Sequence, residues 1–291
     1  MKIESFPEFA CPYALKLAAQ SRAFARQVFA SRAELKPDGY SKDPFGETST
    51  ASVCYGLKQR FSDRVLIMTS NRCFMNCRHC TRRGLLDAAE VVTTPEQLKA
   101  CVDYVTAHPM VRDVLLSGGD VLTLTDRKVE EFVSTFSALP QIEMVRLCTR
   151  ALCSNPGRIT PALVSRLKKF KKVWVNTQFN SAEELTPEAV AAAARLVEAG
   201  IPVSCQTVLL RGVNDSVPKL LALFRALTVA RIRPYYVFQC DPIAGISHFR
   251  VPLEKAKMLE KRCAESIGGL SLPRFVADIP GASRKVPLSE L

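Results

Sequence analysis

The sequence predicts an α/β protein: a partial barrel of six βα units with a helical lead-in before it. Three observations support this fold class. Apolar, β-branched stretches recur along the chain, each is followed by a segment with helix-start signals, and from the second stretch onward they begin roughly 30 residues apart, which is the length of a βα unit. Six units are too few for a closed eight-stranded barrel, so an open barrel is favoured, with a doubly wound sheet as the alternative.

Strands are predicted where the apolar runs are continuous and do not alternate, a pattern typical of strands buried on both faces of a parallel sheet. They are expected at Arg64–Thr69, Val111–Ser117, Met144–Thr149, Val173–Phe179, Pro202–Leu209 and Arg233–Gln239. In both architectures the carboxyl ends of the strands meet at one edge, so the functional residues are expected there.

Helices are predicted between the strands, where a serine or threonine cap precedes a helical segment, often with proline in the first turn. The capped starts are Thr94, Thr125, Thr160, Thr186 and Ser216. A sixth helix without such a cap is expected after Val251-Pro252. Gly200 is well placed to end the fourth helix in the left-handed conformation.

Length and composition limit the classes of protein that this chain can form. Residues 1–60 are expected to be a lead-in with one helix over about Ala14–Ser31, and residues 61–291 the barrel with a C-terminal segment. Hydrophobic residues at 47% and charged residues at 23% are ordinary globular values. No uncharged apolar run approaches the roughly 18–20 residues of a membrane helix, and the acidic start does not resemble a signal peptide. We therefore expect a soluble cytoplasmic protein whose 11 cysteines are buried thiols or metal ligands, not disulfides.

A cysteine-rich loop follows the first predicted strand directly. Cys73, Cys77 and Cys80 have the pattern C-x-x-x-C-x-x-C, and three thiols at that spacing in one loop can converge on a soft metal centre. No fourth cysteine lies within reach in the sequence, and His79, between two ligands, suits a tetrahedral zinc site poorly. Three thiolates on a four-iron cluster leave one iron open for a substrate or cofactor.

With this spacing after a buried strand, the sequence resembles the radical S-adenosylmethionine (SAM) superfamily. The resemblance implies a partial barrel, a [4Fe-4S] cluster on the three cysteines, and SAM bound at the open iron, where reduction cleaves it to a 5′-deoxyadenosyl radical. Ser117, Gly118, Gly119 and Asp120 end the second predicted strand and match the superfamily's glycine-rich segment beside the methionine moiety of SAM. Alone, those four residues would indicate an ordinary turn.

Further motifs resemble the lysine 2,3-aminomutase family, in order over about residues 43–288. They are Cys80–Arg83, Leu116–Asp120, Val173–Asn180, Gln206–Asp215, Arg233–Tyr236, Gln239–Asp241, His248–Arg250 and Phe275–Gly281. The resemblance implies pyridoxal 5′-phosphate (PLP) as another cofactor, and migration of an amino acid's nitrogen from C2 to C3. It also implies that Gln206 belongs to the cofactor-binding residues.

The resemblance assigns the PLP site to three basic residues. Lys285 stands at the position of the family's Schiff-base lysine, after a turn that carries Ala282–Arg284 where the family is nearly all glycine. Arg60 and Arg64 match the arginines that bind the phosphate, a role that suits the planar fork of a guanidinium.

The substrate residues are assigned in the same way. Arg82 matches the residue that binds the substrate carboxylate, and Asp241 and Asp278 match the pair that binds the ε-ammonium of lysine. Two carboxylates in one cavity repel each other unless a cation lies between them, so the pair predicts a cationic side chain on the substrate. The structural alternatives are a helix cap for Asp241 and a turn for Asp278.

The chain also departs from the family pattern. Phe61 and Phe238 stand where the lysine enzymes have tyrosines, and Gln178 replaces a histidine. The sequence stops at Leu291 without the cysteine-bearing extension of the lysine enzymes, so the zinc site and assembly of those enzymes are not carried over. The other cysteines are expected to be small buried residues: Cys11, Cys54, Cys101, Cys148, Cys153, Cys205, Cys240 and Cys263.

Four hypotheses follow, and the leading one is a radical aminomutase that converts L-lysine, or a close cationic amino acid, to its β-isomer. The others are β-lysine formation for elongation factor P, a radical enzyme that modifies RNA, and a non-catalytic cluster protein. The net charge of +12 and the basic stretch Arg166–Lys172 permit RNA, but the chain has no aromatic-interleaved basic patch. The expected partners are an amino acid substrate and an electron donor of the flavodoxin or ferredoxin type, with a homo-oligomer left open.

Overall fold

The computed structural model describes residues 6–47, 56–86 and 91–291, and within them nine strands form one sheet in chain order. The pairs from β2 to β8 are parallel, whereas β1 and β9 add antiparallel edges. The strands are β1 Leu57–Phe61, β2 Arg64–Ser70, β3 Asp113–Gly118, β4 Met144–Cys148, β5 Val173–Gln178, β6 Val203–Leu209, β7 Arg233–Gln239, β8 Arg274–Ala277 and β9 Val286–Pro287. The six predicted strands are β2–β7, so the partial barrel is confirmed and the doubly wound alternative, which would need another strand order, is wrong.

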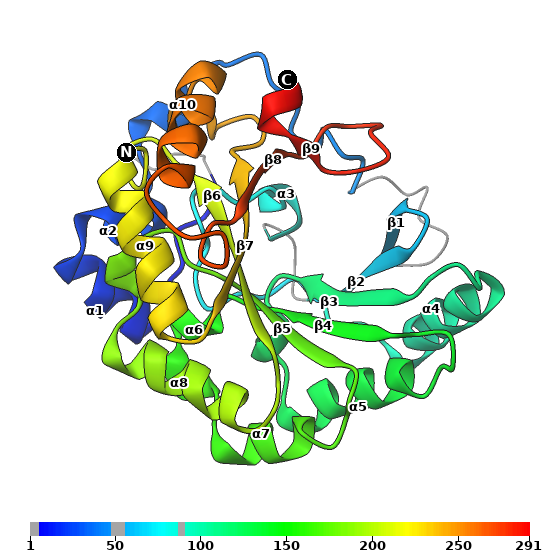
Figure 1. The fold of residues 1–291 in the computed structure, drawn as a ribbon. Helices are drawn as coiled ribbons and strands as arrows, with labels where there is room; N and C mark the ends of the chain where they lie inside the picture. Colours follow the sequence, from blue (N-terminus) through cyan, green and yellow to red (C-terminus); the bar gives the residue numbers. More distant parts are fainter. Residues whose placement is uncertain (1–5, 48–55, 87–90) are drawn as a thin grey trace.

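The helices lie in an arc outside the sheet (Figure 1). They are α4 Pro95–Ala107, α5 Asp126–Ser137, α7 Pro161–Leu167, α8 Pro187–Glu198, α9 Val217–Val229 and α10 Leu253–Ala264. The short α6 Ala151–Ser154 lies between α5 and α7 in the chain, and the short α3 Arg83–Leu86 precedes α4. Threonine caps begin four of the helices as predicted, but the Ser216 side chain makes no capping hydrogen bond. Gly200 has φ +79° at the end of α8, as the sequence predicts.

The lead-in differs from the prediction of one helix. Two helices, α1 Pro12–Gln20 and α2 Arg22–Val28, meet at Ser21, whose extended backbone breaks the first helix. The Ser21 hydroxyl accepts a hydrogen bond from the Phe24 amide at 3.0 Å, so this serine caps a new helix instead of continuing the old one. Residues 57–60, which we assigned to the lead-in, form most of β1.

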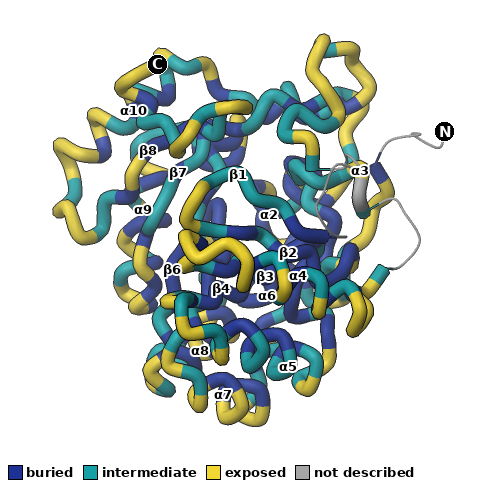
Figure 2. Tube along the Cα trace, turned by 90° about the vertical axis from the view of Figure 1, so that its right-hand side faces the viewer, coloured by how far each residue is buried: buried dark blue, intermediate teal, exposed yellow. Residues whose placement is uncertain are grey.

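Burial is concentrated in the strands and in the helix faces that turn toward them (Figure 2). Val114, Leu116, Val145 and Leu147 in the central strands have no exposed surface, which agrees with a sheet covered on both faces. Among the described residues, no helix combines the length and the apolar character that crossing a bilayer requires.

Candidate active site

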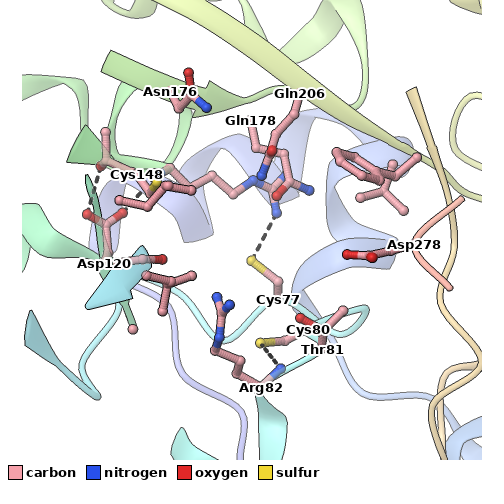
Figure 3. Close-up of a pocket in the computed structure, with 18 of the residues that line it drawn as sticks. Cys77, Cys80, Thr81, Arg82, Asp120, Cys148, Asn176, Gln178, Gln206 and Asp278 are labelled. Carbon is pink, nitrogen blue, oxygen red and sulfur yellow. Dashed lines mark hydrogen bonds between the residues drawn. The ribbon is translucent and has the colours of Figure 1, made fainter. Parts of the chain in front are cut away.

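All fourteen residues that the sequence analysis assigns to ligands line one cavity of about 340 Å³ on the inner side of the sheet. Its walls come from the cysteine loop after β2, the glycine turn after β3, and the inner faces of β5, β6 and β7. Figure 3 shows Asn176, Gln178 and Gln206 on one side, with Cys77, Cys80 and Arg82 on the loop that faces them. The fold therefore brings the predicted residues together, and their separate roles stay predictions.

The lead-in holds the cysteine loop in place. Arg78 has no exposed surface and forms an ion pair with the equally buried Glu34 at 2.6 Å, and its guanidinium also donates to the Phe6 carbonyl at 2.8 Å. The Asn76 amide donates to the Phe9 carbonyl at 2.7 Å. A buried charge pair needs several hydrogen bonds to offset its desolvation, and here those bonds fix the loop to the N-terminal segment.

The three thiols line the cavity without converging on one point. Burial and neighbouring thiols raise the pKa of Cys73, and the same two causes raise the pKa of Cys80 to about 11. Within the described ranges, no three histidine, cysteine or acidic side chains are grouped closely enough to hold one metal ion. In a four-iron cluster each thiolate binds a different iron, so the sulfurs need not converge on one point.

The glycine turn after β3 packs against the start of the cysteine loop. The Gly119 amide donates to the Ser70 carbonyl at 2.7 Å, and the Asp120 amide donates to the Arg72 carbonyl at 2.6 Å. A Cβ on Gly119 would overlap the Arg72 carbonyl oxygen, so glycine is required there by the approach of the protein's own backbone.

The side chain of Asp120 is fully engaged with the protein. One carboxylate oxygen accepts from the Leu122 amide at 2.9 Å and the Thr149 hydroxyl at 2.7 Å, and the other accepts from the Arg150 amide at 2.7 Å. Burial raises the pKa of this carboxyl group despite those bonds. We infer that Asp120 positions the turn after β4, whereas its predicted contact with SAM stays untested.

Among the predicted PLP and substrate residues, Arg60 and Lys285 both contact Asp278 inside the cavity. Arg60 on β1 forms two contacts with Asp278, at 2.6 and 3.1 Å, and the Lys285 ammonium also donates to Asp278. The Lys285 ammonium lies 5.2 Å from the ring centre of Phe61 and 5.3 Å from that of Phe238. Two apolar ring faces therefore lie beside the lysine.

Burial and neighbouring charges shift the pKa values of Lys285, Asp278 and Asp241. It lowers the pKa of Lys285, although the charge of Asp278 opposes that shift. Burial alone would raise the pKa of Asp278, but the hydrogen bond from Arg60 and the charge of Lys285 bring it below its ordinary value. Burial and the charge of Asp278 raise the pKa of Asp241 to about 7.

Arg82 and Arg64, the other two predicted anion-binding residues, both have contacts within the chain. Arg82 lies 2.6 Å and 2.9 Å from the two carboxylate oxygens of Glu47, which also line the cavity. The Arg64 guanidinium lies 4.2 Å from the Phe61 ring centre and 3.5 Å from Asp63. Sequence reasoning missed Glu47, because a lone acid in an irregular segment carries no pattern.

The remaining cysteines follow the prediction in part. Cys101, Cys153, Cys205, Cys240 and Cys263 are buried, Cys11 and Cys148 are only partly buried, and Cys54 lies outside the described residues. Cys148 lines the cavity, so it is not simply a packing residue.

Several side chains of the basic stretch Arg166–Lys172 form contacts within the chain. Arg166 and Lys169 pair with Glu130 at 2.5 and 3.3 Å, and the Lys172 ammonium donates to the carbonyl groups of Ser137 and Leu139. These partners lie on or just after α5, so the stretch joins two outer helices.

Fold and site together define a class of protein. Residues 67–224 match the family model of the radical SAM superfamily, and the solved structure of Streptococcus suis SuiB bound to S-adenosylmethionine shares the fold with a TM-score of 0.58, at 15% identity over 75% of this chain and 51% of that chain. The chain belongs to the radical SAM superfamily, which supports SAM and a [4Fe-4S] cluster as its cofactors.

Within that superfamily, the chain belongs to the lysine 2,3-aminomutase family. It is 42% identical to the L-lysine 2,3-aminomutase of Fusobacterium nucleatum over 84% of this chain and 58% of that protein. It is 34% identical to the glutamate 2,3-aminomutase of Clostridioides difficile over 88% of this chain and 60% of that protein. The chain thus spans about three-fifths of the length of these relatives.

Proposed function

We propose that the chain is a radical SAM, PLP-dependent 2,3-aminomutase that acts on a cationic amino acid, with L-lysine as the main substrate. The observation that carries this proposal is the acidic pair: Asp241 and Asp278 face one cavity, and the pKa of Asp241 rises to about 7 partly because of the charge on Asp278. A substrate ammonium between the two carboxylates would relieve their repulsion. Lysine offers that cation, and glutamate would add a third acid.

The residues fit the cofactors of such an enzyme. Three thiols line the cavity beside a turn that only glycine can form. A partly desolvated lysine in the same cavity shares the carboxylate of Asp278 with Arg60. When bound, the cluster and SAM supply a primary carbon radical that removes a hydrogen atom, and PLP supplies an aldehyde that holds the substrate amine. Cys73, Cys77 and Cys80 would hold the cluster. Lys285, Arg60 and Arg64 would hold PLP.

The protein's own part is to bind and orient the substrate. Arg82 would bind the substrate carboxylate, while Asp241 and Asp278 would bind its side-chain ammonium. Holding the two ends of a flexible amino acid fixes the carbon between them, which converts a collision into an intramolecular step. The buried strands shield the inner wall of the cavity from solvent, and a carbon radical needs protection from loose hydrogen donors.

A substrate panel tests the proposal. Protein reconstituted without oxygen is incubated with reductant, SAM and PLP, separately with lysine, arginine, ornithine, glutamate and alanine, and the β-amino acids are measured. We expect β-lysine as the main product, and Asp241→Asn to reduce the preference for lysine over alanine. β-Glutamate as the main product would refute the assignment of the acidic pair.

The PLP lysine has its own test. Wild-type protein mixed with PLP is expected to show a visible absorption band at about 420 nm, which is typical of an adduct between PLP and a lysine. Lys285→Ala should abolish that band, whereas Lys257→Ala, at a half-buried lysine of α10 that does not line the cavity, should keep it. A band that survives in Lys285→Ala would show that another lysine binds the cofactor.

A further inference from the structure

We propose that Arg150 is a positioning residue for the iron–sulfur cluster, and that its charge raises the cluster's reduction potential through the sulfur of Cys77. Arg150 follows β4, and its Nη1 donates to the Cys77 sulfur at 3.0 Å, a hydrogen bond drawn from Cys77 in Figure 3. The inference rests on the proposed function, because it takes Cys77 as a cluster ligand.

The guanidinium of Arg150 also contacts a buried acid. Nη2 of Arg150 lies 3.1 Å from a carboxylate oxygen of Glu184, which has no exposed surface, and 2.5 Å from the amide oxygen of Gln27. The Gln27 amide nitrogen donates in turn to Glu184 at 2.8 Å. The charge beside Cys77 therefore belongs to an ion pair: Nη1 of Arg150 contacts the sulfur, and Nη2 contacts the acid.

The backbone of Arg150 is fixed as firmly as its side chain. Its amide donates to Asp120, which also accepts from the Thr149 hydroxyl and so joins the glycine turn to the end of β4. The Nε of Arg150 is buried and has no hydrogen-bond partner among the residues that the structure describes. A buried donor without a partner costs free energy, so this donor indicates a further acceptor in the cavity, such as the cluster.

This arrangement has a direct electrochemical consequence. Hydrogen bonds to the sulfurs and nearby charge set the potential of an iron–sulfur cluster, and a positive charge favours the more negative, reduced form. Arg150, which contacts the sulfur directly, should favour reduction, while Glu184, which contacts the guanidinium, should partly oppose it. Reduction is the step that SAM cleavage requires, so the pair would adjust how readily the enzyme is activated.

Opposite substitutions test the proposal. In the reconstituted holoenzyme without SAM, the midpoint potential is measured by reductive titration with detection by electron paramagnetic resonance. Arg150→Met should lower the reduced-to-oxidised ratio at a fixed potential about tenfold, which is 59 mV for a one-electron couple. Glu184→Gln should shift the midpoint potential upward, and Arg150→Lys, which keeps the positive charge, should have a potential close to that of the wild type. The double variant Arg150→Met/Glu184→Gln should have a potential between those of the two single variants. It should also remain folded, because it leaves no unpaired buried acid.

A matched control removes a different arginine. Arg166 forms an ion pair with Glu130 at 2.5 Å on the outer helices and does not line the cavity, so Arg166→Met should leave the potential unchanged. Shifts of the same sign in Arg150→Met and Glu184→Gln, or a shift that occurs only with SAM present, would overturn the inference. Absence of a cluster in wild-type protein would instead overturn the proposed function, and with it this inference.

Discussion

Arg60 and Asp278 form an ion pair across the open side of the barrel, with nitrogen–oxygen distances of 2.6 and 3.1 Å. Arg60 lies on β1, at one end of the sheet, and Asp278 follows β8, near the other end. The resemblance to the aminomutase family gives Arg60 to the cofactor phosphate and Asp278 to the substrate. In this structure the two residues bind each other, so the cofactor phosphate and the substrate ammonium would each have to break this ion pair in order to bind.

This competition predicts that Asp278→Asn binds PLP more tightly than the wild type. The substitution frees Arg60 for the phosphate and removes the charge that keeps Lys285 protonated, and an unprotonated amine is needed to attack an aldehyde. We expect the dissociation constant for PLP, measured from the visible band, to fall about threefold to tenfold. Arg60→Gln should raise it, and weaker PLP binding by Asp278→Asn would contradict the competition.

Glu47 should compete with the substrate in the same way. Its carboxylate lies on Arg82 where a substrate carboxylate is proposed to bind, so an incoming amino acid must displace it. Glu47→Gln should lower KM about threefold to tenfold and leave kcat unchanged, because an interaction made equally in the ground and transition states affects only binding. Steady-state kinetics of β-lysine formation measure both constants.

A surface variant provides the control for Glu47. Glu254 on α10 is 83% exposed at its side chain, so Glu254→Gln should change neither constant. If Glu47→Gln raised KM instead, Glu47 would be a residue that orients Arg82 for the substrate, and the competition would be refuted.

The central strands and helices could be predicted because their local signals agree with their tertiary positions. The buried run of β4 and the Thr160 cap of α7 are each legible within a few residues. The edge strands β1 and β9, and β8 beside β9, were missed because they are short, and β1 is mostly polar. Such strands form only because a neighbouring strand supplies hydrogen bonds.

The sequence predicts which residues form the site, but not which of them contact each other. The fourteen residues identified from the motifs all line one cavity, but a motif assigns a role to each position without indicating which other residue it contacts. The contacts of Arg60 with Asp278 and of Arg150 with Cys77 join residues far apart in the chain. Nothing in the local sequence encodes such a contact, because it depends on how the strands curve.

Gly119→Ala should prevent the cysteine loop from assembling. A methyl group there would overlap the Arg72 carbonyl, so the backbone of the glycine turn would have to move away from the loop. We expect at least a severalfold loss of iron and sulfide per chain after reconstitution. Gly157→Ala, with nothing within 4 Å of the added carbon, is the matched control and should bind iron normally. Equal iron content in both variants would show that the close packing is not needed.

Asp241 should make the preference for a cationic side chain depend on pH. Its pKa of about 7 lies well above the ordinary value of an aspartate, so the carboxyl group is increasingly protonated as the pH falls through 7. The lysine ε-ammonium stays charged over this range, and it needs the ionised carboxylate. Binding of lysine relative to norleucine, which lacks the ammonium, should therefore weaken by up to about tenfold per pH unit below pH 6 and level off above pH 8.

Norleucine cancels the pH effects that arise from the common amine and carboxylate, so the ratio of the two dissociation constants isolates the side-chain subsite. These constants are measured with PLP-loaded protein in the absence of reductant, from pH 5.5 to 8.5. In Asp241→Asn the ratio should be close to flat, because the remaining acid, Asp278, has a pKa below its ordinary value and stays ionised throughout. A wild-type ratio that did not change between pH 6 and pH 8 would show that Asp241 does not face the substrate cation.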